Sequence, residues 1–185
     1  MKSELLIQTL LEQTRKSINQ AENIRVADLK NLTWRQNKTS WNILECLEHL
    51  NRYSDFYLPQ IEAEIKNSNT KADIEFKSGL IGGYFAKSML PGKKLNKMKT
   101  FKDKNPLNAK LDKRVIDKFI EQQVKLVHLL NQSRSVSLNK VKIKTSISRL
   151  IKLKLGDTFQ FYINHIIRHL AQVNRIQTVM NDAAQ

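Results

Sequence analysis

Apolar residues recur at three- and four-residue steps over most of this 185-residue chain, and that spacing places them on one face of an α-helix. Only 5 Gly and 3 Pro interrupt the pattern, and few segments show the period-two alternation of a strand. The sequence therefore predicts an all-α protein. We expect four long helices, over about residues 3–21, 40–67, 112–130 and 157–179.

Capping residues help to place the beginnings of these helices. Ser3 is a candidate N-cap for the first helix, and the hydroxyls of Thr39 and Ser40 precede the second. Gly156 interrupts the chain before the fourth helix, where Asp157 and Gln160 have the spacing of a capping box. Each N-cap is predicted to satisfy a backbone N–H that the first turn leaves without a partner.

Two connections separate these helices. Residues 68–111 contain most of the glycines and two of the prolines, which predicts a long crossover with short helical pieces. Residues 133–146 read as a polar connection, and Ile147 to Leu155 as one or two helical turns. Four amphipathic helices favour a four-helix bundle. We expect one domain over residues 1–185, with the long crossover between the second and third helices.

The net charge of +15 is the most unusual bulk property, with a pI of about 10.0. Lysines concentrate in residues 93–110 and 140–154, in two connections that would attract polyanions. Aromatic residues are not interleaved with them, as they are on surfaces that bind single strands. A solubilising or anion-attracting role is therefore favoured over specific nucleic-acid binding.

Apolar stretches and cysteines indicate the compartment. No window approaches the roughly 18 consecutive apolar residues of a membrane span, and the first residues lack the apolar stretch of a signal peptide. Cys46 is the only cysteine, which excludes an internal disulfide and a cysteine-rich zinc site. We expect a cytoplasmic protein that does not associate with membranes.

Three histidines are candidate metal ligands. His165 and His169 stand four residues apart beside the apolar stripe of the fourth helix, so both rings project from one face. Imidazoles at this spacing can share a metal at about 2.0 to 2.1 Å. His49 lies at the edge of an apolar face of the second helix, where a third ring could converge and leave an open coordination position.

Other interpretations of these residues stay open. Many helices carry two histidines at this spacing by chance, and His49 fits equally well as an ordinary histidine at a helix interface. His128 lies about 100° from the apolar stripe of the third helix, so we expect it to be exposed and not a ligand. Glu45, one turn before His49, is a candidate fourth ligand or partner of a ligand.

Two segments carry longer motifs. In SWNILECLEHLNRY, Trp41 is followed eight residues later by His49. The second segment, LGDTFQFYINHIIRHLAQVNRI, has an L-G-D…H-x-x-R-H-x-x-Q pattern that begins at Leu155. Together with the lysine-rich segment KMKTFKDKNPLN, they resemble the DinB/YfiT-like superfamily of metalloenzymes, and specifically its DinB-like proteins. The resemblance extends from about Thr39 to Ile176.

The resemblance implies a fold and a site. The family fold is a four-helix bundle with a long crossover between helices two and three. Its metal triad takes one histidine from the second helix and two from the fourth, and these roles fall on His49, His165 and His169. The metal would be a divalent ion such as Zn²⁺ or Ni²⁺. Ile166 departs from the family pattern, because related proteins often have an acidic residue there.

The resemblance also implies an activity. Characterised relatives use their metal to activate a low-molecular-weight thiol such as mycothiol or bacillithiol, which implies a thiol transferase or isomerase acting on a small electrophile. Arg168 and the crossover lysines are candidates for binding the anionic cosubstrate, and a surface cation is the alternative for Arg168. We expect a homodimer. The rival hypothesis is a non-catalytic, stress- or DNA-associated protein with a structural metal, which the +15 charge and the family's DNA-damage-inducible name suggest.

Overall fold

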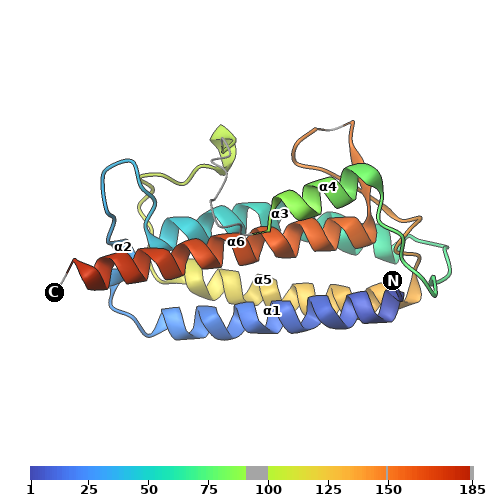
Figure 1. The fold of residues 1–185 in the computed structure, drawn as a ribbon, viewed down its shortest axis with the longest axis horizontal. Coiled ribbons are helices and arrows are strands. Elements are labelled where there is room, and N and C mark those ends of the chain that lie inside the picture. Colours follow the sequence, from blue (N-terminus) through green and yellow to red (C-terminus); the bar gives the residue numbers. More distant parts are fainter. Residues whose placement is uncertain (91–99, 149, 184–185) are drawn as a thin grey trace.

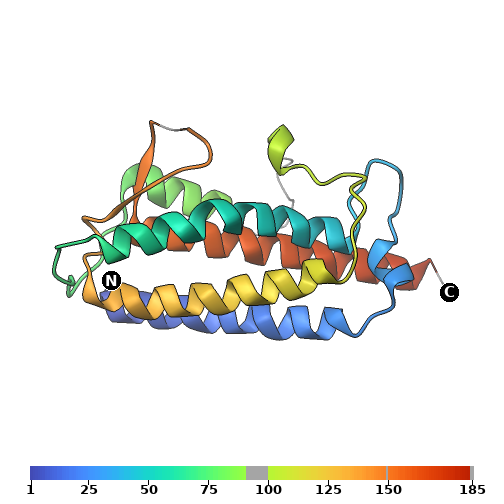
Figure 2. The ribbon, with the colours of Figure 1, turned by 180° about the vertical axis from the view of Figure 1, so that it is seen from behind.

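The computed structural model describes residues 1–90, 100–148 and 150–183. Within them, four long helices lie side by side in an elongated bundle (Figure 1 and, from behind, Figure 2). Their bounds are α1 Ser3–Arg25, α3 Ile43–Lys66, α5 Arg114–Gln132 and α6 Leu155–Asp182. The shorter elements are α2 Leu29–Thr33, α4 Leu80–Ser88, η1 Lys102–Lys104, η2 Ser133–Ser135, β1 Lys142–Lys144 and β2 Lys152–Lys154. The predicted four-helix bundle is confirmed.

Helices α3 and α5, which follow one another in the bundle, run in the same direction. Asp55 on α3 pairs with Lys118 on α5, and seven residues further along Glu62 pairs with Lys125. Partners whose numbers rise together mark parallel helices. The chain must therefore travel back along the bundle between α3 and α5, and the predicted long crossover does this (Figure 1).

Helix α6 runs antiparallel to α3 and parallel to α1. On its α3 side, His49 meets His165 and Ser54 meets Tyr162, so the partner numbers change in opposite directions. On its other side, α6 packs against α1. The bundle therefore places α3 and α6 next to each other as an antiparallel pair.

Helix α4, which is part of the crossover, packs against α6. Gly79 N donates to Asp157 Oδ2 over 2.9 Å, and Asn164 Nδ2 donates to the carbonyl of Ala86 over 2.9 Å. Glycine is needed at position 82, because a Cβ there would lie 2.4 Å from the carboxylate of Asp157. Asp157 therefore fastens the crossover to the first turn of α6, and the prediction that it caps α6 through a box with Gln160 is wrong.

Two other predicted caps also differ from the structure. The second long helix begins at Ile43 and is capped by a reciprocal box between Asn42 and Glu45, so neither Thr39 nor Ser40 is its cap. In the first helix Ser3 is already helical. Its N–H donates to the carbonyl of Ile74, so the start of the chain pairs with the crossover. A capping rule that considers only neighbouring residues cannot predict this contact.

The segment predicted to form helical turns before α6 is instead half of a β-hairpin. Strands β1 and β2 pair antiparallel, with Ile143 opposite Leu153 on the buried side and lysines on the other. Lysine alternates with apolar residues in 141–144 and again in 151–155, and this period-two pattern is typical of paired strands. Its outward lysines form a solvated basic face.

Buried apolar side chains from all four long helices form one core. Cys46 is part of it, and burial raises the pKa of its thiol. None of the helices in the described residues combines the length and apolar character that a membrane crossing needs. The lysines at positions 93, 94, 97 and 99 lie outside the described residues.

Candidate metal centre

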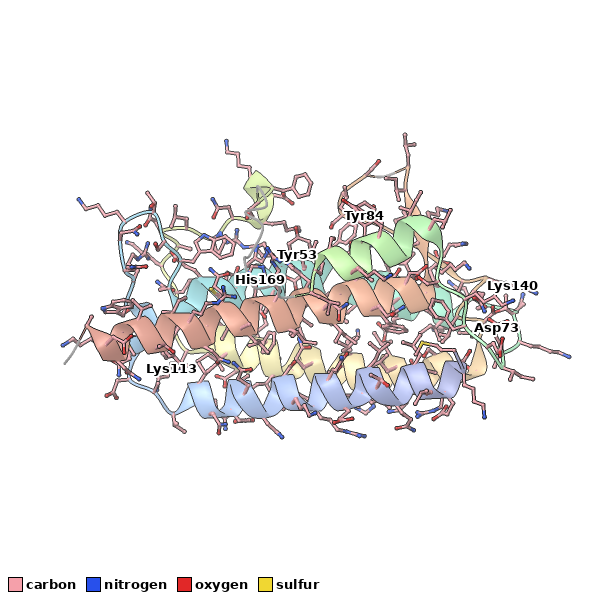
Figure 3. The ribbon with its side chains drawn as sticks, viewed as in Figure 1. Tyr53, Asp73, Tyr84, Lys113, Lys140 and His169 are labelled. Atoms are coloured by element: carbon pink, nitrogen blue, oxygen red, sulfur yellow. The ribbon has the colours of Figure 1, made fainter. Side chains whose placement is uncertain are left out.

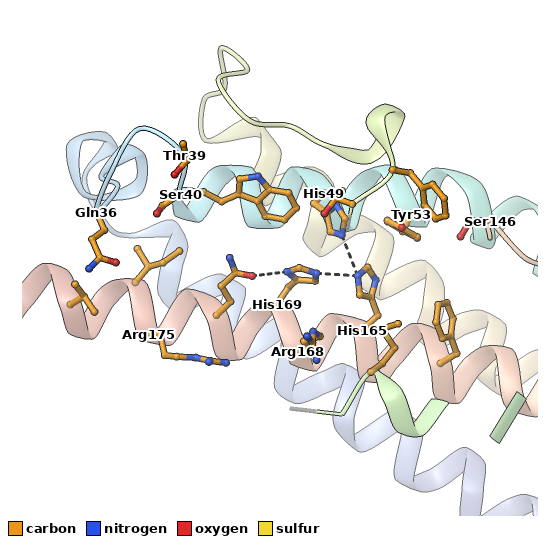
Figure 4. Close-up of a pocket in the computed structure, with 18 of the residues that line it drawn as sticks. Gln36, Thr39, Ser40, His49, Tyr53, Ser146, His165, Arg168, His169 and Arg175 are labelled. Atoms are coloured by element: carbon orange, nitrogen blue, oxygen red, sulfur yellow. Dashed lines mark hydrogen bonds between the residues drawn. The ribbon is translucent and has the colours of Figure 1, made fainter. Parts of the chain in front are cut away.

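Three histidine rings meet between α3 and α6 (Figure 4). The Nε2 atom of His165 lies 3.2 Å from Nε2 of His49 and 3.0 Å from Nε2 of His169. All three candidate ligand atoms lie within 4.8 Å of one another. Two nitrogens bound tetrahedrally at about 2.05 Å from one metal are about 3.3 Å apart. The two distances to His165 therefore suit one shared ion, and the third pair of nitrogens, within 4.8 Å, would move closer together when the ion binds.

The helices bring these rings together for simple geometric reasons. Residues 165 and 169 are one turn apart on α6, and the antiparallel packing of α3 places His49 opposite them. His49 and His165 are 3% and 6% exposed, so packing holds both rings in place. The predicted convergence of all three histidines is thus found in the structure. His128 lies exposed on α5, as predicted.

The outer nitrogens of two rings are fixed by acceptors. His49 Nδ1 donates to the carbonyl oxygen of Lys104 over 2.8 Å, and His169 Nδ1 donates to the side-chain oxygen of Gln172 over 3.0 Å. Because these oxygens only accept, each Nδ1 carries the single proton of a neutral ring. The Nε2 atoms of both rings therefore present lone pairs toward His165.

Burial keeps the rings neutral. Loss of hydration lowers the pKa of His49 to about 4 and that of His169 to about 3. The pKa of His165 also falls well below its usual value, first through burial and then through the neighbouring histidines. At neutral pH a proton on His165 Nε2 could satisfy only one of the two lone pairs that face it. A divalent cation at this point would satisfy all three nitrogens, so these residues fit a metal.

The crossover supplies the acceptor that orients His49. Lys104 is the last residue of η1, and the segment that follows it is tied to α3. Arg52 Nη1 donates to the carbonyl of Asn105 over 3.1 Å, and Trp41 Nε1 donates to the side chain of Asn105 over 3.1 Å. The hydrogen bond to the outer nitrogen of a histidine ligand fixes its tautomer and orientation. This segment of the crossover therefore orients His49 without contacting the three Nε2 atoms.

Glu45 has a different role from the predicted one. Its carboxylate accepts hydrogen bonds from the backbone of Asn42 and Asn108 and from Arg35 Nη2, at 2.9, 2.6 and 3.0 Å. It therefore caps α3 and holds the crossover, and the prediction that it is a fourth ligand or a partner of His49 is wrong. The reason is that Glu45 occupies the third position of the helix, where its carboxylate bends back toward the N-cap.

Aromatic rings surround the histidines. The Trp41 ring centroid is 4.8 Å from that of His49 and 5.8 Å from that of His169, while Tyr53 lies 4.7 Å from His165. Figure 3 shows Tyr53 and His169 on the same side of the bundle. Such rings limit the access of water to the histidines. Tyr53 is one turn from His49 on the same face, a signal that the sequence contains.

The histidines line a pocket of about 600 Å³, within the size range of small-molecule sites. The walls beyond the rings already described come from α6, from the segment before α3, and from the crossover and hairpin. They are Trp34, Gln36, Thr39, Ser40, Met89, Thr100, Phe101, Ser146, Ile147, Phe161, Arg168, Gln172, Arg175, Ile176 and Val179. In the described part of the chain, no aspartate, glutamate, lysine or cysteine lines the pocket.

Arg168, the predicted cosubstrate-binding residue, is part of the pocket wall and only 9% exposed. It is therefore not the surface cation of the alternative interpretation. Burial lowers its pKa, and the nearby charge of Arg175 lowers it further. Arg175 lies within the segment LGDTFQFYINHIIRHLAQVNRI but outside the pattern quoted for it, and Trp34 carries no sequence signal because its connecting segment has no periodicity.

The comparisons with known proteins agree with this architecture. A model of the DinB superfamily matches residues 10–173, which include all three histidines and Arg168 of the pocket. The chain belongs to the DinB superfamily. Among curated proteins, no relative matches this DinB superfamily member.

A solved structure supports the fold of this DinB superfamily chain. It is YfiT from Bacillus subtilis, described as a probable metal-dependent hydrolase with an unusual four-helix bundle topology. The two proteins share 14% sequence identity with a TM-score of 0.55, and the match covers 97% of this chain and 87% of YfiT. At this identity the likeness establishes the bundle topology, and the chemistry must be argued from the residues of the pocket.

Proposed function

We propose that this protein is a metal-dependent enzyme that binds one divalent ion through His49, His165 and His169 and transfers or isomerises a small substrate with the help of a low-molecular-weight thiol. The observation that supports it best is the meeting of three neutral imidazole nitrogens in the wall of a pocket. Because imidazole ligands suit zinc, nickel, copper and iron, the donor set favours a transition metal over magnesium or calcium.

The number of donors supports a catalytic site over a structural one. Structural zinc sites are closed by four protein ligands, whereas catalytic sites keep a position for water or substrate. The cluster has three members among the described residues, and the pocket lies beside it. A bound ion would supply Lewis-acid activation, lowering the pKa of a coordinated thiol or water.

The pocket favours a thiol over water as the nucleophile. A water molecule attacking a substrate is often assisted by a carboxylate base, as in the metalloproteases, and none lines the pocket in the described residues. A thiol, once deprotonated, needs no further base. The thiol must come from a cosubstrate, because Cys46 is buried in the core with a raised pKa.

The chain's own residues would then position the reactants. Arg168 would bind the anionic part of the thiol cosubstrate, and Trp41 and Tyr53 would keep water from the reacting sulfur. The thiol would lose its proton to solvent, and the thiolate sulfur would form a bond to the electrophilic carbon of the second substrate. The bond from that carbon to the leaving group would break, with its electron pair departing on the leaving group. A homodimer and a cytoplasmic location stay predictions from the sequence.

Metal analysis of untagged protein, followed by thiol titration of the cobalt-loaded form, tests this proposal. We expect about one ion per chain, its loss in His165→Ala, and its retention in the matched control His128→Ala, which changes an exposed histidine. Addition of 2-mercaptoethanol should produce a sulfur-to-cobalt charge-transfer band, and ethylene glycol should not.

Activity provides the second part of the test. The metal-loaded protein should accelerate the reaction of a small thiol with an electrophile, and the gain should vanish with chelator and in His49→Ala. Unchanged metal content in His165→Ala would refute the ligand set. A loaded site with no spectral response to any thiol would support the rival, a structural metal in a stress- or DNA-associated protein.

A further inference from the structure

Helix α4 presents its large apolar side chains to solvent. It packs against α6 through its smallest residues, because Gly82 and Ala86 are buried on that side. Leu80, Ile81 and Tyr84 lie on the opposite face and are 96%, 59% and 71% exposed. Figure 3 shows Tyr84 above α4, on the side away from α1 and α5. This is the reverse of an ordinary surface helix, which buries its apolar stripe in the core.

The β-hairpin places positive charge beside this helix. Strand β2 contacts α4, and Lys154 Nζ donates to the carbonyl of Lys77, just before α4, over 2.6 Å. In the register of the two strands, Lys142 lies opposite Lys154 and Lys144 lies opposite Lys152. Like charges directly opposite one another destabilise a pair of strands. The stability of the hairpin therefore does not explain why lysines occupy its outer side.

No acidic residue in these two segments offsets the lysines. Residues 77–90 and 141–156 contain no aspartate or glutamate. None of their lysines takes part in an ion pair within the part of the chain that the structure describes. Leu150, between the strands, is 94% exposed. Figures 1 and 2 show α4 and the hairpin on the same side of the bundle, opposite α1 and α5. We call this surface the α4–hairpin face, and its members are Leu80, Ile81, Tyr84, Leu150, Lys77, Lys87, Lys142, Lys144, Lys152 and Lys154.

The combination of charge and apolar surface distinguishes among the possible partners. A second copy would place the same lysines against each other, because a two-fold interface joins the same patch of both chains. A nucleic acid would neutralise the lysines, but its phosphate backbone offers exposed leucines no apolar surface. A bilayer that contains anionic lipids offers both, since its headgroups attract lysines and its acyl boundary accepts apolar side chains.

We propose that the α4–hairpin face binds the surface of membranes that contain anionic lipids. Leu80, Ile81, Tyr84 and Leu150 enter the headgroup region, and the lysines contact the charged headgroups. Helix α4 has 9 residues, a length of about 13 Å, so it lies along the surface and does not cross it. The expectation of no membrane association came from the absence of a spanning segment, which surface binding does not need. No metal ligand belongs to this face, so the inference is independent of the function proposed above.

Co-sedimentation of the full chain with large vesicles tests this proposal. One set of vesicles consists of phosphatidylcholine alone, and the other contains about one third phosphatidylglycerol, which is anionic. We expect the protein to bind the anionic vesicles, and to bind the neutral ones about tenfold or more weakly. The affinity for anionic vesicles should fall as the salt concentration rises.

The apolar contribution is measured with single substitutions. Leu80→Gln should lower the affinity for anionic vesicles about tenfold, because the leucine no longer leaves water on binding. The matched control is Val26→Gln, which changes an exposed apolar residue at the end of α1. It should bind like the wild type. Because both residues are exposed, both variants should fold, and circular dichroism checks this.

The charged contribution is measured with two triple variants. Replacing Lys142, Lys144 and Lys152 with Gln should lower the affinity for anionic vesicles about 100-fold, since each lysine near an anionic surface contributes about fivefold. The control replaces Lys30, Lys38 and Lys110 with Gln, which removes the same charge from exposed positions outside the α4–hairpin face. Its affinity should fall by less than about tenfold.

Failure to bind the anionic vesicles would overturn the proposal. So would binding that is unchanged in Leu80→Gln and lost in the hairpin triple variant, because charge alone would then explain it. Analytical ultracentrifugation without vesicles tests the remaining alternative. A dimer that Leu80→Gln dissociates and Val26→Gln does not would assign the face to a second copy, and the proposal would be wrong.

Discussion

Acid should destabilise the metal-free protein through its buried histidines. An unfolded histidine has a pKa of about 6.5, whereas burial lowers the pKa of folded His49 to about 4 and of His169 to about 3. Below pH 6.5 the unfolded state binds protons that the folded state does not. The free energy of unfolding therefore falls as the pH falls, and for His49 the loss ends near pH 4.

The size of this effect follows from the pKa shifts. Each such histidine lowers the free energy of unfolding by about 1.4 kcal/mol per pH unit below its unfolded pKa. The fall for His49 from 6.5 to about 4 corresponds to about 3 kcal/mol in total. His165 acts in the same direction, because burial lowers its pKa as well. A bundle with a typical stability of about 5–15 kcal/mol would show this loss clearly.

Urea denaturation of metal-free protein at pH 7.5, 6.5 and 5.5, followed by circular dichroism, measures the effect. His169→Gln should remove about 1.4 kcal/mol of the loss between pH 7.5 and 5.5, and the exposed-site control His128→Gln should keep the wild-type slope. Parallel pH dependences in the wild type and His169→Gln would show that the histidine rings are not held neutral by burial. The neutral state of the rings, which their fit to a metal requires, would then be refuted.

Three further predictions concern residues outside the ligand set. Gly156→Ala should lower the free energy of unfolding by about 1–3 kcal/mol, because its Cβ would lie 2.5 Å from the Phe76 ring; an unchanged urea midpoint would contradict the close packing. Glu45→Ala should cost about 2 kcal/mol and weaken metal binding in calorimetric titration, since Asn108 loses its acceptor; wild-type metal affinity would refute the link to the crossover. Cys46 should react with a thiol reagent only in urea, and rapid labelling of native protein would contradict its burial.

Local rules predicted much of this protein. The three- and four-residue spacing of apolar residues located the long helices to within a few residues, because the period of a helix depends only on its backbone geometry. For the same reason the i, i+4 spacing placed His165 and His169 on one face. The same reasoning missed the hairpin, although the alternation around Ile143 and Leu153 was visible. The strands are only three residues long, and the helical pattern on both sides of them favoured a helical interpretation of the segment.

The sequence by itself thus determined the helices, the pair of histidines on α6 and the resemblance of its motifs to a family. Only the tertiary structure decided that α3 and α6 are neighbours, which brings His49 to that pair. It also assigned Glu45 to the crossover and Asp157 to α4, and placed Arg175 in the same pocket as the histidines. These contacts join residues far apart in the chain, and their geometry depends on how whole helices pack, which no local spacing specifies.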